Sequence, residues 1–213
     1  MNSVAELARD LIDGVAFHDA PLYLALGDFE WCVRSNNPAL LEGLSDYFRH
    51  IVGRAKAPTH NCEILLIERD VFDPPCQFVD WSREAGKTGR KDAYIDSADG
   101  RVMQKVKTGM VFLQGDGPAI AAGPCAANDN QIINFINSQY MTCLQHDGWQ
   151  ICHAAGVEMS GRALGLAGFS GGGKSTLMLH MLDDDRVNFL SNDRLFVRQR
   201  GGQALAAGIP KLP

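Results

Sequence analysis

The stretch LGLAGFSGGGKST, residues 164–176, decides how this sequence is interpreted. It satisfies the pattern G-x-x-x-x-G-K-[ST], in which Gly168 and Gly173 are the two glycines and Lys174-Ser175 follow. An apolar run, residues 163–167, comes directly before it and predicts a strand. A glycine-rich loop after a strand is typical of a P-loop, which wraps its backbone N–H groups around a phosphate.

The segment after the loop predicts a helix. Its apolar side chains recur at helical spacing: Leu177, Met178, Met181 and Leu182. The N-terminus of a helix offers unpaired N–H groups and the positive end of its dipole, and both favour an anion. The strand, the loop and the helix therefore agree on a phosphate site.

Each residue of the loop has an expected role. The amides of residues 171–174 cradle the β-phosphate, and Lys174 bridges the β- and γ-phosphates as a point charge. The hydroxyl of Ser175 is a ligand for Mg²⁺, so ATP and Mg²⁺ are the expected cofactors. The residues expected to contact the nucleotide are Gly168, Ser170, Gly171, Gly172, Gly173, Lys174, Ser175 and Thr176.

A second acidic group is needed to hold the metal or to activate a nucleophile. After the predicted helix, an apolar run at 187–190 predicts a strand beside the P-loop strand, and it ends in Ser-Asn-Asp-Arg. We expect Asp193 in this turn to be the acid and the second metal ligand. The acidic run at 183–185 precedes the strand, and we expect it to be a solvated helix end.

His153 is the histidine whose position is informative. It lies 15 residues before Gly168, on a predicted strand that runs antiparallel to the P-loop strand across a turn at Gly161. A lone histidine in an apolar strand is more often structural than functional, and on spacing alone both interpretations stay open.

The bulk composition excludes several classes of protein. The 213 residues are 46% hydrophobic and 21% charged, as in an ordinary globular protein, and the net charge of −5 argues against a nucleic-acid partner. No apolar run approaches the ~20 residues of a membrane span, and the first 12 residues do not have the pattern of a signal peptide. None of the six cysteines forms a C-x-x-C pair. We therefore expect a cytoplasmic protein without a membrane partner.

The sequence predicts two domains with different patterns of secondary structure. Residues 1–126 predict a mixed α/β domain of the α+β kind, with a hairpin around Gly27-Asp28 and a β-meander over 86–123 that turns at Asp99-Gly100. Residues 127–213 predict the nucleotide-binding core, which begins with an amphipathic helix from Gln131. The role of residues 1–126 stays open between substrate docking, dimerisation and sensing.

Three segments together resemble the HPr serine kinase/phosphorylase family, and more closely its divergent relatives. They are CHAAGV at 152–157, GRALGLAGFSGGGKST at 161–176 and SNDRLFV at 191–197, and the resemblance covers residue 131 to the end. It implies an α/β P-loop kinase core of the type shared with ATP-dependent phosphoenolpyruvate carboxykinase, which transfers a γ-phosphoryl group, usually to a protein serine. It also implies that His153 matches the active-site histidine of the family, so that His153, Lys174 and Asp193 form the catalytic set.

The sequence departs from the family pattern in three places. Asn192 stands where the family has the first of two aspartates, and an amide cannot act as a general base. Thr176 stands where glutamate is common. The family continues well beyond the position of Pro213, so we expect a core truncated at its C-terminus, whose sheet is completed by preceding strands, by a partner subunit, or not at all.

The main hypothesis is therefore an ATP-dependent kinase of the HPr kinase type, most simply a protein-serine kinase. Its partner is a phosphoryl acceptor, either a protein or a small molecule. The alternatives are a nucleotide-binding regulatory switch without transfer activity and a kinase of small molecules. An ATPase motor ranks lower because the signature of a transport ATPase is absent, and a GTPase ranks lower still because no N-K-x-D motif occurs. We expect a homo-oligomer.

Overall fold

The computed structural model describes residues 3–82, 86 and 89–211, and it is a mixed α/β protein. Its contacts divide it into two compact units, Met1–Ile136 (unit 1) and Asn137–Pro213 (unit 2). The division falls inside helix α3, Asp129–His146, whereas the boundary expected from the sequence, residue 126, lies just before that helix. The two units are described separately below.

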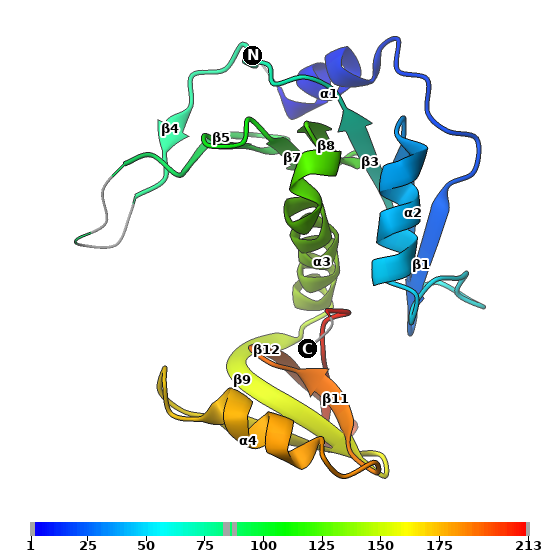
Figure 1. Ribbon diagram of the computed structural model, residues 1–213, viewed down its shortest axis with the longest axis vertical. Coiled ribbons are helices and arrows are strands. Elements are labelled where there is room, and N and C mark those ends of the chain that lie inside the picture. The colour runs from blue at the N-terminus through cyan, green and yellow to red at the C-terminus, as the bar shows by residue number, and fades with distance from the viewer. Residues whose placement is uncertain (1–2, 83–85, 87–88, 212–213) are drawn as a thin grey trace. The chain divides into compact units, whose positions relative to one another are not determined.

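Unit 1 is built on an eight-stranded sheet with the strand order β1-β2-β3-β8-β7-β6-β5-β4 (Figure 1). The strands are β1 Leu22–Leu26, β2 Phe29–Ser35, β3 His60–Glu68, β4 Val79–Asp80, β5 Asp92–Ser97, β6 Gly100–Lys105, β7 Val111–Gly115 and β8 Ala119–Gly123. The expected hairpin around Gly27 is confirmed as β1–β2, and the expected meander corresponds to β5–β8, apart from its residues 87–88, which lie outside the described residues.

Three neighbouring strands of this sheet, β2, β3 and β8, run parallel to one another, and the other pairs are antiparallel. Helix α2, Pro38–Tyr47, connects β2 to β3, as parallel pairing requires. Asn37 begins this helix, because its side-chain oxygen accepts a hydrogen bond from the N–H of Leu40 at 3.2 Å. The Pro at the first helical position is pre-organised for it.

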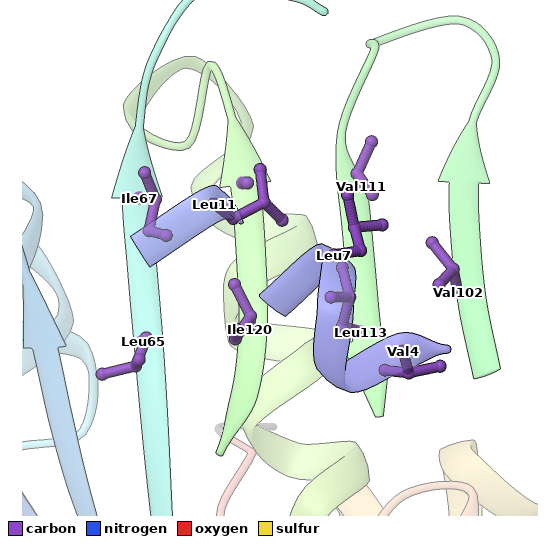
Figure 2. Packing of buried hydrophobic residues seen from close by; sticks show 10 residues of the cluster. Val4, Leu7, Leu11, Leu65, Ile67, Val102, Val111, Leu113 and Ile120 are labelled. Atoms are coloured by element: carbon purple, nitrogen blue, oxygen red, sulfur yellow. The ribbon is translucent and has the colours of Figure 1, made fainter. Parts of the chain in front are cut away.

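Helix α1, Val4–Ile12, covers one face of the unit 1 sheet (Figure 2). Its buried apolar residues Val4, Leu7 and Leu11 pack against the strands. Within each strand the residues of this cluster alternate, because successive side chains of a strand point to opposite faces of the sheet. Those strand residues are Leu65, Ile67, Val102, Val111, Leu113, Ile120 and Ala122. The carboxylate of Asp99 accepts hydrogen bonds from the N–H groups of Val4 and Ala5, at 3.0 and 2.9 Å, and so fixes the start of α1 to the β5–β6 turn.

The opposite face of the sheet is covered by α2 and by the first part of α3 (Figure 1). Phe112 alternates with the α1-facing residues of β7, and its ring lies 4.9 Å from that of Phe135 in α3. Ile64 and Leu66 alternate in the same way on β3 and are fully buried. Unit 1 is thus a sheet with helices on both faces.

The carboxyl ends of the parallel strands in unit 1 meet at Glu68. Its carboxylate accepts hydrogen bonds from the backbone N–H of Ala126 at 2.7 Å and from the side chain of Asn37 at 3.4 Å. Asn36 closes the arrangement, since its side chain bonds both the N–H and the carbonyl of Glu68, at 2.7 and 2.9 Å. The starts of α2 and of the 3₁₀ turn Ala126–Asn128 are thereby tied to the end of β3.

Unit 2 contains a five-stranded sheet with the order β10-β9-β12-β13, in which β11 also pairs with β9 (Figure 1). The strands are β9 Gln150–Met159, β10 Arg162–Ala167, β11 Asn188–Ser191, β12 Arg194–Arg200 and β13 Gln203–Ala207. Every strand pair of this sheet within the described residues is antiparallel. The sheet combines two strands that precede the glycine-rich loop in the sequence, β9 and β10, with three that follow it.

The long strand β9 organises unit 2. It pairs with β10 along one edge, and with β12 and then β11 along the other. The β9–β10 hairpin turns through Ser160 and Gly161, both with positive φ (53° and 77°), which confirms the turn expected at Gly161. Gly156 of β9 leaves room for the side chain of Leu195, because a Cβ there would lie only 2.7 Å from a Leu195 methyl carbon.

Helix α4, Lys174–Met181, packs on one face of this sheet (Figure 1). Met178, which is buried, contacts Ala155 and Val157 of β9, and Leu166 of β10 packs against the same cluster. The helix expected after the glycine-rich loop is thereby confirmed, although Leu177 and Leu179 are about half exposed.

Candidate functional site

The glycine-rich loop joins β10 to α4 and is exposed throughout residues 168–173. Gly171 and Gly173 have positive φ angles of 77° and 79°, a region that side chains other than glycine rarely adopt. Gly173 precedes the first residue of α4, and its carbonyl accepts the N–H of Leu177 at 2.9 Å. The glycines thus turn the backbone so that the loop leads directly into a helix N-terminus, which is the geometry of an anion site.

Lys174, the first residue of α4, folds its side chain back over this loop. Its Nζ donates hydrogen bonds to the carbonyl oxygens of Gly168 at 2.9 Å and Phe169 at 3.2 Å. These carbonyls hold the ammonium group above the loop without a carboxylate partner among the described residues. A phosphate oxygen that reaches the loop meets a positive charge already in place.

The side chains of His153 and Asp193 contact each other in unit 2. The Nε2 atom of His153 lies 2.9 Å from Oδ1 of Asp193, and both side chains are 64% exposed. The backbone supports the contact, because Arg194 pairs with His153 in the β12–β9 ladder and the Asp193 carbonyl accepts the N–H of Ala154 at 3.1 Å. The two residues expected from the sequence to take part in catalysis are therefore adjacent.

The strand register places this pair at the end of the sheet where β10 leads into the glycine-rich loop. The last β10–β9 pair is Ala167 with Ala154, so the next residue of each strand is Gly168 on one side and His153 on the other. His153 also alternates in phase with Ala155, which contacts Met178 of α4, so its side chain is on the face that α4 covers. The glycine-rich loop, Lys174 and the His153–Asp193 pair belong to one end and one face of one sheet.

The strand before Asp193 does not lie where the sequence placed it. Strand β11 pairs with β9, and β9 separates it from β10, the strand before the glycine-rich loop. The prediction that this strand lies directly beside β10 is therefore wrong, because residues 156–158 of β9 pair with β10 on one edge and with β11 on the other. Asp193 still reaches His153 because the chain turns from β11 into β12 at this position.

Ser191 is a supporting residue that the sequence did not single out. It is 1% exposed, and its hydroxyl donates to the Arg194 carbonyl at 2.7 Å and accepts from the Arg194 N–H at 3.0 Å. These bonds close the turn that carries Asn192 and Asp193. A serine two residues before the acid, next to an asparagine, is the composition of a side-chain-stabilised turn and was the available signal.

Two side chains of the candidate site, Ser175 and Asp193, carry oxygen atoms of the type that binds Mg²⁺. In the part of the chain that the structure describes, no group of three or more His, Cys, Asp or Glu side chains is placed to hold a metal. Mg²⁺ in nucleotide sites takes only one or two protein ligands and completes its shell with phosphate oxygens and water. The hydroxyl of Ser175 is exposed and the carboxylate of Asp193 is 64% exposed, so the oxygen atoms of both side chains are accessible.

The acidic run at 183–185 is arranged differently. Asp184 forms an ion pair with Arg186 at 2.6 Å, and its hydrogen bonds with this arginine lower its pKa to about 2. Asp183 contacts His180, one helical turn before it, at 3.3 Å. These exposed carboxylates interact with side chains of their own segment, as expected for a solvated helix end.

Comparison of the chain with protein-family models, with curated proteins and with solved structures gives no match. Among the described residues, no helix combines the length and the apolar character needed to cross a lipid bilayer. The case for a function therefore rests on the chemistry of the site itself.

Proposed function

We propose that this chain is an ATP-dependent phosphotransferase with a P-loop kinase core of the HPr kinase type. The observation that carries the proposal is the common location of three groups: a glycine loop at a helix N-terminus, the ammonium of Lys174, and the His153–Asp193 pair. A phosphate site alone suits any nucleotide-binding protein. A histidine held by a carboxylate beside that site adds a group that can take a proton from an acceptor.

The triphosphate of ATP lies along the glycine loop in this proposal. The N–H groups of residues 171–174 bind the β-phosphate, and Lys174 exchanges its contacts with two carbonyl oxygens for phosphate oxygens. Ser175 and Asp193 would hold Mg²⁺ through their side-chain oxygens, and the bound ion would supply positive charge against the triphosphate. Most of the rate enhancement then comes from position and electrostatics.

The His153–Asp193 pair serves the acceptor hydroxyl. With Nε2–H donated to Asp193, Nδ1 of His153 is the ring atom that accepts a proton. The acceptor oxygen forms a bond to the γ-phosphorus, the bond from this phosphorus to the β,γ-bridging oxygen breaks, and ADP leaves with the electron pair. The acceptor's proton passes to Nδ1, so that the atoms and charges balance. The acceptor is a hydroxyl of a protein serine or of a small molecule.

A second candidate function, a nucleotide-dependent switch without transfer, is favoured by Asn192. This residue precedes Asp193 in the exposed turn between β11 and β12, and its amide does not accept a proton at neutral pH. In a switch, ATP binds and orders the loop, and the His153–Asp193 pair only fixes the turn. Both functions require that the chain binds ATP, and only the phosphotransferase transfers the γ-phosphoryl group to an acceptor.

The first test is calorimetric titration of Mg–ATP into the parent chain and into Lys174→Ala. Loss of one charged hydrogen-bonding group costs about 1.5–3 kcal/mol, so the variant should bind ATP roughly ten- to a hundredfold more weakly. Lys211→Ala is the matched control, because it removes the other lysine of unit 2 and should leave the affinity unchanged.

The second test follows the γ-phosphate of labelled ATP into cell extract proteins and metabolites. A labelled acceptor that disappears with Lys174→Ala and with His153→Ala supports the phosphotransferase. Tight binding without any labelled acceptor supports the switch. A parent chain that does not bind Mg–ATP would refute both functions.

A further inference from the structure

Strand β10, which leads into the P-loop, has a free edge. It stands at one end of the strand order β10-β9-β12-β13, and no described strand pairs with the edge that faces away from β9. Five of its six residues are exposed, and Leu164 retains 48% of its surface although it is apolar. Free edges are normally protected by proline, lysine, a bulge or a covering segment. The sequence RALGLA offers only Arg162 as a charge.

The backbone groups that this edge presents follow from the hairpin. A two-residue loop separates Met159 from Arg162, so these two residues form the hydrogen-bonded closing pair, and the bonding direction alternates after it. Arg162, Leu164 and Leu166 therefore bond to β9. The N–H and carbonyl groups that point away from β9 belong to Ala163, Gly165 and Ala167.

This edge is complementary to itself in antiparallel orientation. When a two-fold axis passes through Gly165, Ala163 lies opposite Ala167 and all the outward groups of the strand pair with a second copy. Leu164 then lies opposite Leu166 of the partner subunit. These leucines share the α4 face of the sheet, because Leu166 packs against the Met178 cluster and alternate residues share a face. The exposed surface of Leu164 becomes buried in this arrangement.

The same register brings a positive charge to the phosphate site. Arg162 lies opposite Gly168 of the partner subunit, which is the first residue of the glycine loop, and its side chain is on the face of α4. Residues opposite each other across antiparallel strands have Cβ atoms about 5 Å apart, well within the reach of an arginine. Arg162 is exposed and has no ion-pair partner among the described residues.

We propose that two copies of this chain pair through the free edges of β10, and that Arg162 of each copy completes the ATP site of the other. The proposal rests on the function proposed above, since the triphosphate is the anion that attracts the arginine. A second copy fits this edge because β10 begins with the cation Arg162 and leads into the phosphate loop at Gly168. A two-fold axis brings the Arg162 of each copy to the phosphate loop of the other. Arginines supplied in trans stabilise the charge that develops during phosphoryl transfer.

The test is a complementation experiment with two inactive variants. Arg162→Ala should bind Mg–ATP nearly as the parent does but transfer phosphate roughly a thousandfold more slowly. Lys174→Ala should bind ATP roughly ten- to a hundredfold more weakly, so that its own site is mostly empty at an ATP concentration near the parent's Kd, and still provide its Arg162. In an equimolar mixture, half of the dimers are mixed and each holds one whole site, so about a quarter of the parent activity should return.

Two further measurements separate the possible failures. Sedimentation of the parent chain should show a dimer, and Ala163→Pro should give a folded monomer, because it removes an N–H that points away from β9. A parent that is monomeric at assay concentrations with full activity, or a dimer whose mixture shows no recovery, would overturn the shared site and leave the ATP function standing. A parent that does not bind ATP would instead refute the proposed function.

Discussion

The substitution Gly156→Ala should destabilise unit 2 and disturb the candidate site together. The added Cβ lies 2.7 Å from Cδ1 of Leu195, about 0.7 Å closer than the 3.4 Å of an ordinary contact. Leu195 is 3% exposed and lies directly after Asp193-Arg194 in the chain, so it has little room to move without shifting β12. Overpacking of this kind costs about 1–3 kcal/mol. The same shift should weaken the His153–Asp193 contact.

The assay is urea unfolding of the full chain combined with peptide-resolved hydrogen exchange, which reports on β9 and β12 separately from unit 1. Gly43→Ala in α2 is the matched control, because its new Cβ meets nothing within 4 Å, and it should stabilise the helix by about 0.5–1 kcal/mol. Leu195→Val removes both Cδ atoms and should recover part of the stability lost in Gly156→Ala. Equal effects of the two alanine substitutions would refute the packing described for Leu195.

Two further predictions concern charged groups in the two units. Hydrogen bonds from Ser97 and from the first N–H groups of α1 lower the pKa of Asp99 to about 2, so the stability that this carboxylate contributes is complete above about pH 4 and is lost as the pH falls through about 2. Asp99→Asn should remove this part of the acid dependence, which thermal unfolding from pH 6 to pH 2 measures; an unchanged profile would contradict the capping role. Asn192→Asp adds a carboxylate beside Asp193 and should raise the rate of phosphoryl transfer at least about tenfold at equal ATP affinity, and a rate that stays equal or falls would show that the amide does not limit transfer.

Much of the local structure was predictable because short-range rules determine it. The two-residue turn at Ser160-Gly161 follows from the conformational freedom of glycine between two apolar runs, and the helix after the glycine-rich loop follows from its apolar spacing. His153 was singled out by the family resemblance and Asp193 by its place in the turn after an apolar run, and the structure brings their side chains to 2.9 Å.

The pairing of strands was less predictable because it depends on residues far apart in the sequence. Nothing local indicates that β9 takes β11 and β12 on the edge opposite β10, which separates the strand before Asp193 from β10. The parallel pairing of β3 with β8 likewise joins segments more than 50 residues apart. Alternation of apolar residues indicates which face is buried, and it does not indicate which strand is the neighbour.

The carboxylate of Glu68 has a consequence for ligand selectivity across the whole chain. In open sheets with parallel strands, small molecules commonly settle where the carboxyl ends of those strands meet helix starts. In unit 1 that location already holds an acidic side chain, bonded to Ala126 and Asn37. A phosphate that binds there would have to replace the Glu68 carboxylate in its hydrogen bonds with Ala126 and Asn37. Because this carboxylate belongs to the chain itself, it is always present to compete. Under the proposed function, a nucleotide should therefore bind at the glycine-rich loop of unit 2 and not at this end of the unit 1 sheet.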